Sequence, residues 1–437
     1  MNDPRFPPAL KTDSRRSLVE ACFRREAGSA ASIPADEIDL LEAGILDSMA
    51  WVSFLRAIET ASGVSDLGSG LNERSASLGE VLAALQNSAP ENPGADDAGL
   101  IRKLSFSPAQ AMLTGSSVAT GSRLLPSEEV DSAFGMPAGK LRSRAGIESL
   151  AYAAEGESEL TLAATAAQEA LRAASCGAQE LDWIVATSET HHDYPSLSAQ
   201  LHSRLLVREN CAALDVGGAC LGLLNALAVA QSLIGAGQAH TILVASADVH
   251  SRTLTPGRVA GEFGGLFGDG ASAFILHSSA GGDSREGYRV GEFIFGCAGQ
   301  YAAAIQVNDE KNGGLAVQFD GEALSRAAIT RMEKILTAVE LRSGIPRGSV
   351  GGFATHQPNP RLVILLAKQC GVSPDTFPPI ARTRGNLGSS TCGAALHEIL
   401  RSAAKQPRGH RRPVFLASLG PGLLFGGGWL TPHVNGK

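Results

Sequence analysis

The stretch Ala212-Ala-Leu-Asp-Val-Gly-Gly-Ala-Cys-Leu-Gly-Leu-Leu-Asn-Ala-Leu-Ala-Val-Ala-Gln231 places Cys220 between two glycines and a long apolar run. The apolar run has a helical pattern, so Cys220 is expected at or next to a helix N-terminus. The helix dipole and the unpaired N–H groups there favour the thiolate, which is the reactive form of cysteine. This predicts a nucleophile that holds an acyl group. A small buried core cysteine explains this segment equally well.

Two later segments carry a polar side chain just before a helix-like run. They are Ala354-Thr-His-Gln-Pro-Asn-Pro-Arg-Leu362 and Arg384-Gly-Asn-Leu-Gly-Ser-Ser-Thr-Cys-Gly-Ala-Ala-Leu396. Taken alone, His356 is typical of a structural histidine, and Asn386 beside glycine is typical of a turn. Together with Cys220, the two residues supply a nucleophile and two hydrogen-bond donors.

With these residues the chain resembles the 3-oxoacyl-[acyl-carrier-protein] synthase III family (ketosynthase III) of the thiolase-like superfamily. The resemblance covers roughly residues 108–432. It implies an α/β thiolase-like fold of five layers, αβαβα, built from two similar halves and usually dimeric. The halves would be residues 108–282, with the nucleophilic cysteine, and 283–437, with the histidine and asparagine. Further matching segments are Arg144-Ala-Gly-Ile147, Pro195-Ser196, Ala247-Asp248, Phe267-Gly-Asp-Gly-Ala271 and Ser418-Leu-Gly-Pro-Gly422.

Composition narrows the class of protein. The 437 residues are 44% apolar and include 50 glycines, which suits a large, tightly turned core in two or three domains. The net charge of −7 argues against a nucleic-acid partner. The seven cysteines show no CxxC or Cys/His cluster, so we expect no metal and reduced thiols in the cytoplasm. The longest apolar stretch is interrupted by polar residues and reads as a buried helix, so we expect no membrane span.

The first part of the chain differs in character from the rest. Helix patterns over 12–26, 48–61 and 78–85 predict a small all-α bundle of three or four helices within residues 12–88. A stretch rich in Pro, Asn and Gly then predicts a flexible linker at 89–107. Beyond it, strand-like runs alternate with helical runs, which predicts an α/β fold. Those strand-like runs include Trp183–Thr187, Thr241–Ala245, Ala271–Leu276, Gly352–Ala354 and Val414–Ala417.

The segment from Leu41 to Glu59 resembles an acyl or peptidyl carrier domain. The matching feature is Asp47-Ser48 followed by an apolar helix pattern. The resemblance implies that Ser48 carries 4′-phosphopantetheine, attached by a phosphopantetheinyl transferase. Neighbouring carboxylates would steer a basic partner. Asp and Ser are also favoured at helix N-caps, so an ordinary cap is the alternative.

The synthase resemblance also implies roles for the site residues. Cys220 would take an acyl group from a thioester, and its own backbone N–H would be one donor to the developing oxyanion. Gly420 or Gly422 would give the second donor, because Pro421 lacks an N–H. His356 and Asn386 would hold the thioester carbonyl of a malonyl-type extender and stabilise the enolate that forms on loss of CO2. An aspartate in place of Asn386 could not donate, so asparagine favours condensation.

Three residues are weaker candidates for substrate binding. Asn359 and Arg361 match a family stretch that holds the pantetheine arm, and Arg144 matches an arginine near the tunnel mouth. A helix cap and a solvated surface charge are the alternatives. Lys140 stands where bacterial members of the family have a tryptophan that stacks on CoA. This departure weakens the case for CoA as the acyl donor and leaves a carrier protein as the other donor.

The sequence therefore predicts an acyl-transferring, ketosynthase III-type enzyme of polyketide or fatty-acid biosynthesis. Its partners would be an acyl thioester, a malonyl-type carrier protein and a second copy of the chain. One alternative is an acyltransferase that moves the Cys220 acyl group to an alcohol or amine. Another is a non-catalytic scaffold that presents the carrier domain.

Overall fold

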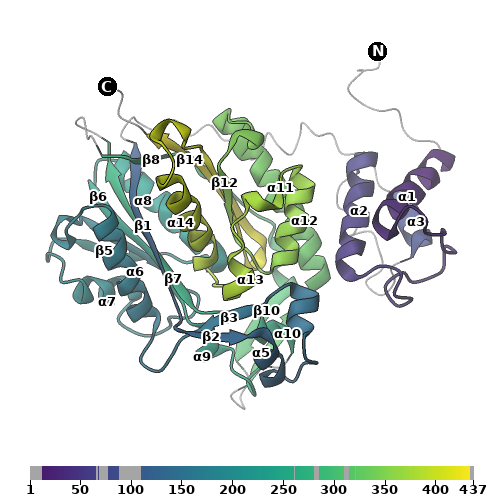
Figure 1. Ribbon diagram of the computed structural model, residues 1–437, viewed down its shortest axis with the longest axis horizontal. Coiled ribbons are helices and arrows are strands. Elements are labelled where there is room, and N and C mark those ends of the chain that lie inside the picture. Colours follow the sequence, from purple (N-terminus) through teal and green to yellow (C-terminus); the bar gives the residue numbers. More distant parts are fainter. Residues whose placement is uncertain are drawn as a thin grey trace. The chain divides into compact units, whose positions relative to one another are not determined.

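The computed structural model describes residues 12–64, 67, 77–87, 110–259, 261–279, 285–309, 314–319 and 321–433 (Figure 1). The chain divides into two compact units, one of Met1–Ile101 with Asp320–Ala328 and the other of Arg102–Phe319 with Ile329–Lys437. The predicted linker at 89–107 lies outside the described residues. The predicted domain limits therefore stay predictions.

The first unit contains the three predicted helices, α1 (Thr12–Ala27), α2 (Ser48–Ser62) and α3 (Leu78–Asn87). Their apolar faces form one core in which Phe54 packs edge-on against Phe23 and beside Trp51. The helix predictions are confirmed.

Helix α2 begins at Ser48 because Asp47 caps it. The Asp47 side chain accepts hydrogen bonds from the backbone N–H groups of Met49 and Ala50, at 3.1 and 2.8 Å. Farther along the helix, Glu59 is buried, where it pairs with Arg56 at 2.6 Å and accepts the backbone N–H of Leu67 at 2.7 Å. The carboxylate of Glu59 is therefore paired inside the core, and the prediction that neighbouring carboxylates steer a basic partner stays a prediction.

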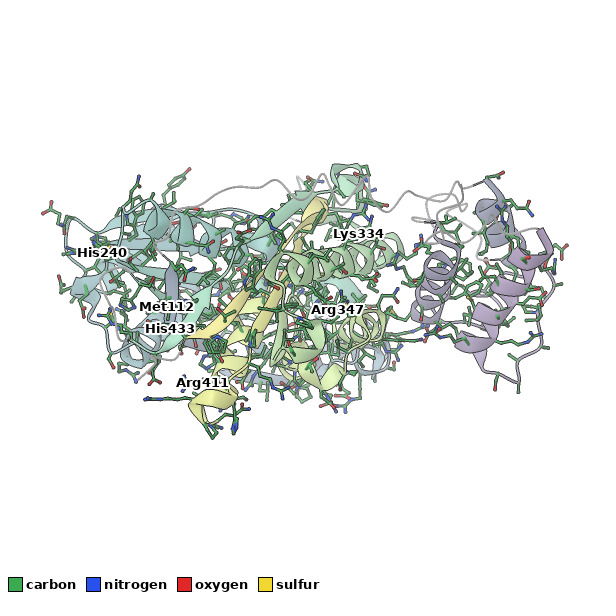
Figure 2. The ribbon with its side chains drawn as sticks, turned by 90° about the horizontal axis from the view of Figure 1, so that it is seen from above. Met112, His240, Lys334, Arg347, Arg411 and His433 are labelled. Atoms are coloured by element: carbon green, nitrogen blue, oxygen red, sulfur yellow. The ribbon has the colours of Figure 1, made fainter. Side chains whose placement is uncertain are left out.

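The second unit is built on a mixed sheet with the strand order β12-β13-β14-β8-β1-β7-β6-β4-β5. Neighbours β12/β13, β4/β5 and β4/β6 run parallel, and the other neighbours run antiparallel. The strand predictions are confirmed, each within a few residues at its ends. Met112 and His433, labelled in Figure 2, lie on β1 and β14, the two strands that flank β8. The strand limits are β1 Ala111–Thr120, β4 Trp183–Thr187, β5 Ala212–Asp215, β6 Thr241–Asp248, β7 Gly270–Ser278, β8 Gly287–Val290, β12 Gly352–Thr355, β13 Val414–Gly420 and β14 Leu424–His433.

Helices cover and separate the strands. α6 (Glu159–Ala173) packs on β1, β6 and β7, and α7 (Leu197–Arg204) packs on β4 and β5 (Figure 1). α8 (Gly222–Gly235) and α14 (Ser390–Ala404) instead contact strands from both ends of the sheet, such as β6 and β13. α11 (Gly321–Ser343) lies against β14, where Gly427 faces Ile335 and Val339. This layering is that of a thiolase-like α/β fold, with Cys220 and Asn386 just before its two central helices.

Shorter elements form a lobe with its own apolar cluster, which includes Val130, Phe134, Leu150 and Phe263. They are α5 (Ser127–Ala133), the π-helical turn η2 (Leu141–Ala145), α9 (His250–Thr253), α10 (Glu262–Gly265), and the strand pairs β2 (Arg123–Pro126) with β3 (Ser149–Tyr152) and β10 (Ile305–Asp309) with β11 (Leu315–Phe319). β9 (Ile294–Cys297) pairs with β14, and α12 (Pro360–Cys370) and α13 (Ile380–Arg384) follow β12. None of the helices in the described ranges has the length and apolar character needed to cross a membrane.

Candidate active site

Cys220 lies in a strained turn immediately before α8. The turn is a single 3-10 segment, η4 (Ala219–Leu221), that leads into the helix. Gly218 has φ +134° and Ala219 has φ +48°, a left-handed conformation that non-glycine residues rarely adopt. Strain of this kind clusters at functional sites, and here it sets Cys220 at the helix start. The predicted position of Cys220 is confirmed.

Strand β13 connects Cys220 to His356. The Ser418 hydroxyl donates to the Cys220 carbonyl at 2.7 Å, and the His356 backbone N–H donates to the Ala417 carbonyl at 3.0 Å. Two consecutive residues of one strand therefore hold segments that are more than a hundred residues apart. The same strand ends at Gly420, where a Cβ atom would lie only 2.7 Å from the Gly218 carbonyl oxygen. The backbone of Gly420 thus lies against the nucleophile turn.

The Phe267-Gly-Asp-Gly segment fixes Asn386. The Gly268 N–H donates to the Asn386 carbonyl and the Asn386 N–H donates to the Leu266 carbonyl, both at 2.9 Å. A side chain at position 268 would overlap the Arg384 carbonyl, so glycine is required there. The match that the sequence showed at this segment therefore has a structural cause.

The Asn386 side chain is oriented by its oxygen. Its Oδ1 accepts hydrogen bonds from the Gly388 N–H and from the Thr391 hydroxyl, each at 3.0 Å. With both donors directed at Oδ1, the amide nitrogen is the group left to interact with a substrate. Gly388 also forms a backbone hydrogen bond with the His356 imidazole, so the two predicted donors share a neighbour.

The electrostatic prediction for Cys220 is wrong. Burial raises the pKa of its thiol well above the usual value, and the negative charges of Glu189 and Asp248 raise it further. A backbone hydrogen bond at the helix start lowers it, as the sequence predicts, but the effect is smaller. The resting nucleophile is therefore a thiol at neutral pH, because burial and two carboxylates outweigh the helix terminus.

Glu189 is a site residue that the sequence reading missed. It follows the end of β4, and its carboxylate faces both the Cys220 thiol and the imidazole of His250, whose Nε2 lies 3.6 Å from Glu189 Oε2. Burial would raise the pKa of Glu189, but hydrogen bonding and the charge of His250, together with the Cys220 thiol, hold it below the usual value. A charged residue two positions after an apolar strand was the available signal.

His356 is held in its neutral form. Burial lowers the pKa of its imidazole to about 4, against an opposing effect of Glu189, and His250 lowers it further. Its Nδ1 is buried without a hydrogen-bond partner among the described residues. At neutral pH the ring is therefore an uncharged donor or acceptor.

We expect His356 not to titrate near the ordinary histidine pKa. Because the pKa of His356 is lowered to about 4, the imidazole becomes protonated only near pH 4 and stays neutral between about pH 5 and 8. NMR of 15N-histidine-labelled protein tests this, with the His356 signal assigned by its loss in H356A. A His356 signal that moves with a midpoint near 6.5 contradicts the assignment.

Comparison with known proteins identifies the family. Residues 214–299 match 3-oxoacyl-[acyl-carrier-protein (ACP)] synthase III, and residues 342–431 match the C-terminal part of the same family. A β-ketoacyl-[acyl-carrier-protein] synthase III of Haemophilus ducreyi is 30% identical over 304 residues, which cover 66% of this chain and 86% of that protein. The chain belongs to the synthase III family.

Solved structures of the family have the same fold. The synthase III of Aquifex aeolicus VF5 is 25% identical, with a TM-score of 0.65 over 74% of this chain and 99% of that one. The synthase III of Pseudomonas aeruginosa PAO1 gives 24% identity and a TM-score of 0.66 over 75% and 100% of the two chains. These matches support the thiolase-like fold.

The weaker synthase III candidates have mixed outcomes. Asn359 caps α12, since its Oδ1 accepts the Leu362 N–H at 3.0 Å, which is the alternative that the sequence left open. Arg361 donates a hydrogen bond to the Ser143 carbonyl, so the segments that carry Arg361 and the exposed Arg144 are in contact. A Cβ atom placed on Gly422 would have no atom within 4 Å, so Gly422 borders open space.

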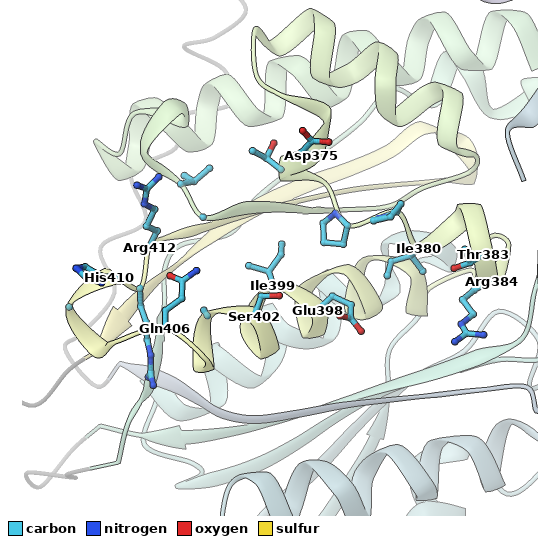
Figure 3. A pocket seen from close by; sticks show the side chains of 18 residues that line it. Asp375, Ile380, Thr383, Arg384, Glu398, Ile399, Ser402, Gln406, His410 and Arg412 are labelled. Carbon is cyan, nitrogen blue, oxygen red and sulfur yellow. The ribbon is translucent and has the colours of Figure 1, made fainter. Parts of the chain in front are cut away.

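Ser48 belongs to the first unit, and its side chain lies outside the described part of the structure. A surface groove of about 1030 Å³ runs beside α14, from Arg412 to Arg384, but it contains none of the three predicted catalytic residues (Figure 3). Across the described ranges, no group of three or more His, Cys, Asp or Glu residues is arranged to hold a metal ion.

Proposed function

We propose that this synthase III loads an acyl group on Cys220 and condenses it with a malonyl-type carrier thioester as CO2 is lost. The observation that carries the proposal is the Asn386 side chain, whose oxygen is occupied and whose amide nitrogen is left to donate. A neutral His356, which shares Gly388 as a hydrogen-bond partner with Asn386, adds a second group without adding charge. The β-ketoacyl synthase III names of the relatives support the same reaction class.

In the proposed reaction, the acyl group forms a thioester with Cys220 Sγ and the donor leaves as a thiol. Loss of CO2 from the extender then gives an enolate, whose oxygen His356 and Asn386 stabilise by hydrogen bonds. The enolate carbon attacks the acyl carbonyl, and Cys220 leaves. For the acyl oxyanion we propose the backbone N–H of Cys220 together with that of Gly420 or Gly422.

A product assay tests the condensation. Purified protein is incubated with an acyl-pantetheine thioester and a malonyl-loaded carrier protein, and the carrier-bound product is identified by mass. We expect a product longer than the donor acyl group by two carbons. Acyl-Cys220 that forms but discharges only when an alcohol or amine is added would reject condensation in favour of the acyltransferase.

For the first unit we propose a carrier domain with 4′-phosphopantetheine on Ser48. The Asp47 cap supports it, because it places Ser48 as the first residue of α2. With a phosphopantetheinyl transferase and CoA, we expect the protein to gain the mass of one phosphopantetheine group and S48A to gain none. The matched control is S349A, at an exposed serine outside the first unit, and this variant should still gain one phosphopantetheine group. Modification of S48A to the wild-type extent contradicts the proposal.

We also propose a homodimer formed across β5. Among the described residues this strand ends the sheet, and its Leu214 is 39% exposed, which places an apolar side chain on an edge that no described strand pairs with. Light scattering should give twice the monomer mass for the wild type and the monomer mass for L214R. The exposed Leu341 on α11 gives the control, and L341R should remain dimeric. A monomeric wild type contradicts the proposal. The cytoplasmic location stays a prediction.

A further inference from the structure

The Cys220 thiol must lose its proton before or during acyl loading. This thiol is buried and carries its proton at neutral pH, yet a thiol is a far weaker nucleophile than a thiolate. Loading therefore requires a group that takes the proton as sulfur attacks. The carboxylate of Glu189 interacts with this thiol through hydrogen bonding and through its charge.

The surroundings of Glu189 suit a proton acceptor. Its Oε1 is buried, with no aligned hydrogen-bond donor among the described residues, so one carboxylate oxygen has the capacity to accept. Its other oxygen, Oε2, lies 3.6 Å from His250 Nε2. The His250 ring is itself fixed by stacking on Phe267, with 4.4 Å between ring centroids. Cys220, Glu189 and His250 therefore interact one after another as a nucleophile, a base and a group that orients the base, which is the arrangement typical of an activated nucleophile.

The backbone fixes this arrangement. Asp248 accepts the backbone N–H of Glu189 at 2.5 Å and, through its other oxygen, the Ser389 hydroxyl at 2.6 Å. A Cβ atom on Gly388 would lie 2.6 Å from both Asp248 Oδ2 and His250 Cε1, so the loop after Asn386 closes over the pair. Glu189 and His250 are therefore built into the same site as the residues of the proposed function.

We propose that Glu189 is a further catalytic residue, which accepts the Cys220 thiol proton during acyl loading and is oriented by His250. This inference rests on the loading step of the proposed function. The S–H bond breaks as the bond between Sγ and the carbonyl carbon forms, and the proton passes to Glu189. When the adduct collapses, the carbon–sulfur bond to the donor breaks and the donor thiolate takes the proton from Glu189. Acyl-Cys220, a free donor thiol and an ionised Glu189 result.

The acid–base properties agree with this assignment. A thiol that attacks a carbonyl becomes strongly acidic as the new bond forms, so a carboxylate of low pKa is basic enough to accept its proton. The same low pKa makes protonated Glu189 a ready donor to the departing thiolate. Burial opposes protonation of His250, but its acidic neighbours raise the pKa of its imidazole above the usual value. The titratable groups around the Glu189–His250 pair are Cys220, Asp248, Asp269 and His356.

The test compares two rates in the full-length protein, with Glu189→Gln as the variant. Loading is followed by mass spectrometry with the acyl-pantetheine thioester that loads the wild type fastest, chosen from acetyl, hexanoyl and dodecanoyl donors. Alkylation of Cys220 by iodoacetamide measures its thiolate content. We expect loading to fall about 10²- to 10⁴-fold. We expect alkylation to rise on the order of tenfold, because removal of the negative charge lowers the thiol pKa.

These opposite changes separate a proton acceptor from a structural residue. Glu340→Gln is the matched control. Glu340 lies on α11 and is paired with Arg347 at 2.6 Å, so the loading and alkylation rates of this variant should match those of the wild type. His250→Gln should move the acid limb of the loading rate to higher pH, since loss of the imidazolium raises the pKa of Glu189.

Two results overturn the proposal. One is a Glu189→Gln protein whose loading stays within about threefold of the wild type. The other is loading and alkylation that change in the same direction, in which case the carboxylate acts on Cys220 only through charge or packing. Neither result bears on condensation, because loading precedes the extender and the two-carbon product is measured separately.

Discussion

Asn386→Asp is expected to abolish condensation while it leaves acyl loading intact. The substitution keeps the size of the side chain, and its oxygens still accept from Gly388 and Thr391. It removes the amide N–H that would bind the enolate oxygen and places a negative charge beside the developing enolate. Loss of one oxyanion donor lowers the rate about 10²- to 10³-fold, and the added charge lowers it further. The measurement is the two-carbon-extended product, with acyl-Cys220 quantified in parallel.

The control for this variant is Asn308→Asp, the same change at an exposed residue of β10. It should form product at the wild-type rate. If Asn386→Asp condenses within about tenfold of the wild type, Asn386 does not bind the enolate. If it loses loading and product equally, the residue supports the Cys220 turn instead. Either result contradicts the assignment of the Asn386 amide N–H as a donor to the enolate oxygen, on which the condensation proposal depends.

Cys220→Ala is expected to eliminate acyl-enzyme and condensed product, with a loss of about four orders of magnitude or more. Cys220 holds the electrophilic acyl group, and no other residue in the described part of the site offers a thiol. The extender should still lose CO2 slowly, because His356 and Asn386 act on the enolate and do not require an acyl group. CO2 release and acyl-enzyme are measured on the same sample.

Cys392→Ala is the matched control, because Cys392 is fully buried in α14 and bonded to the Ala354 carbonyl. It should keep both loading and condensation. Acyl-enzyme that persists in Cys220→Ala would show that another residue is the nucleophile.

Local patterns in the sequence predicted much of the fold. The apolar runs and the cap at Asp47 gave the three N-terminal helices, and the alternation of strands and helices gave the α/β layers. The glycines before Cys220 indicated its position at the start of α8. These features depend on residues close in the chain, where spacing and backbone preference decide the outcome.

Properties that depend on distant residues were not predicted. The pKa of Cys220 is raised by burial and by Glu189, which β4 brings in from thirty-one positions away in the chain. Glu59 is neutralised by a buried arginine, which helix periodicity does not reveal. In each case the sequence supplied the residue type, and packing decided its electrostatic environment.

The central claim is most directly tested by following labelled carbon through one turnover. The protein is incubated with an acyl-pantetheine donor and a carrier protein loaded with malonyl labelled by 13C at every carbon. Decarboxylative condensation predicts a product that retains two labelled carbons, with one labelled CO2 released for each product formed. Unlabelled acyl transfer to an alcohol or amine, with the malonyl group left intact, would contradict it.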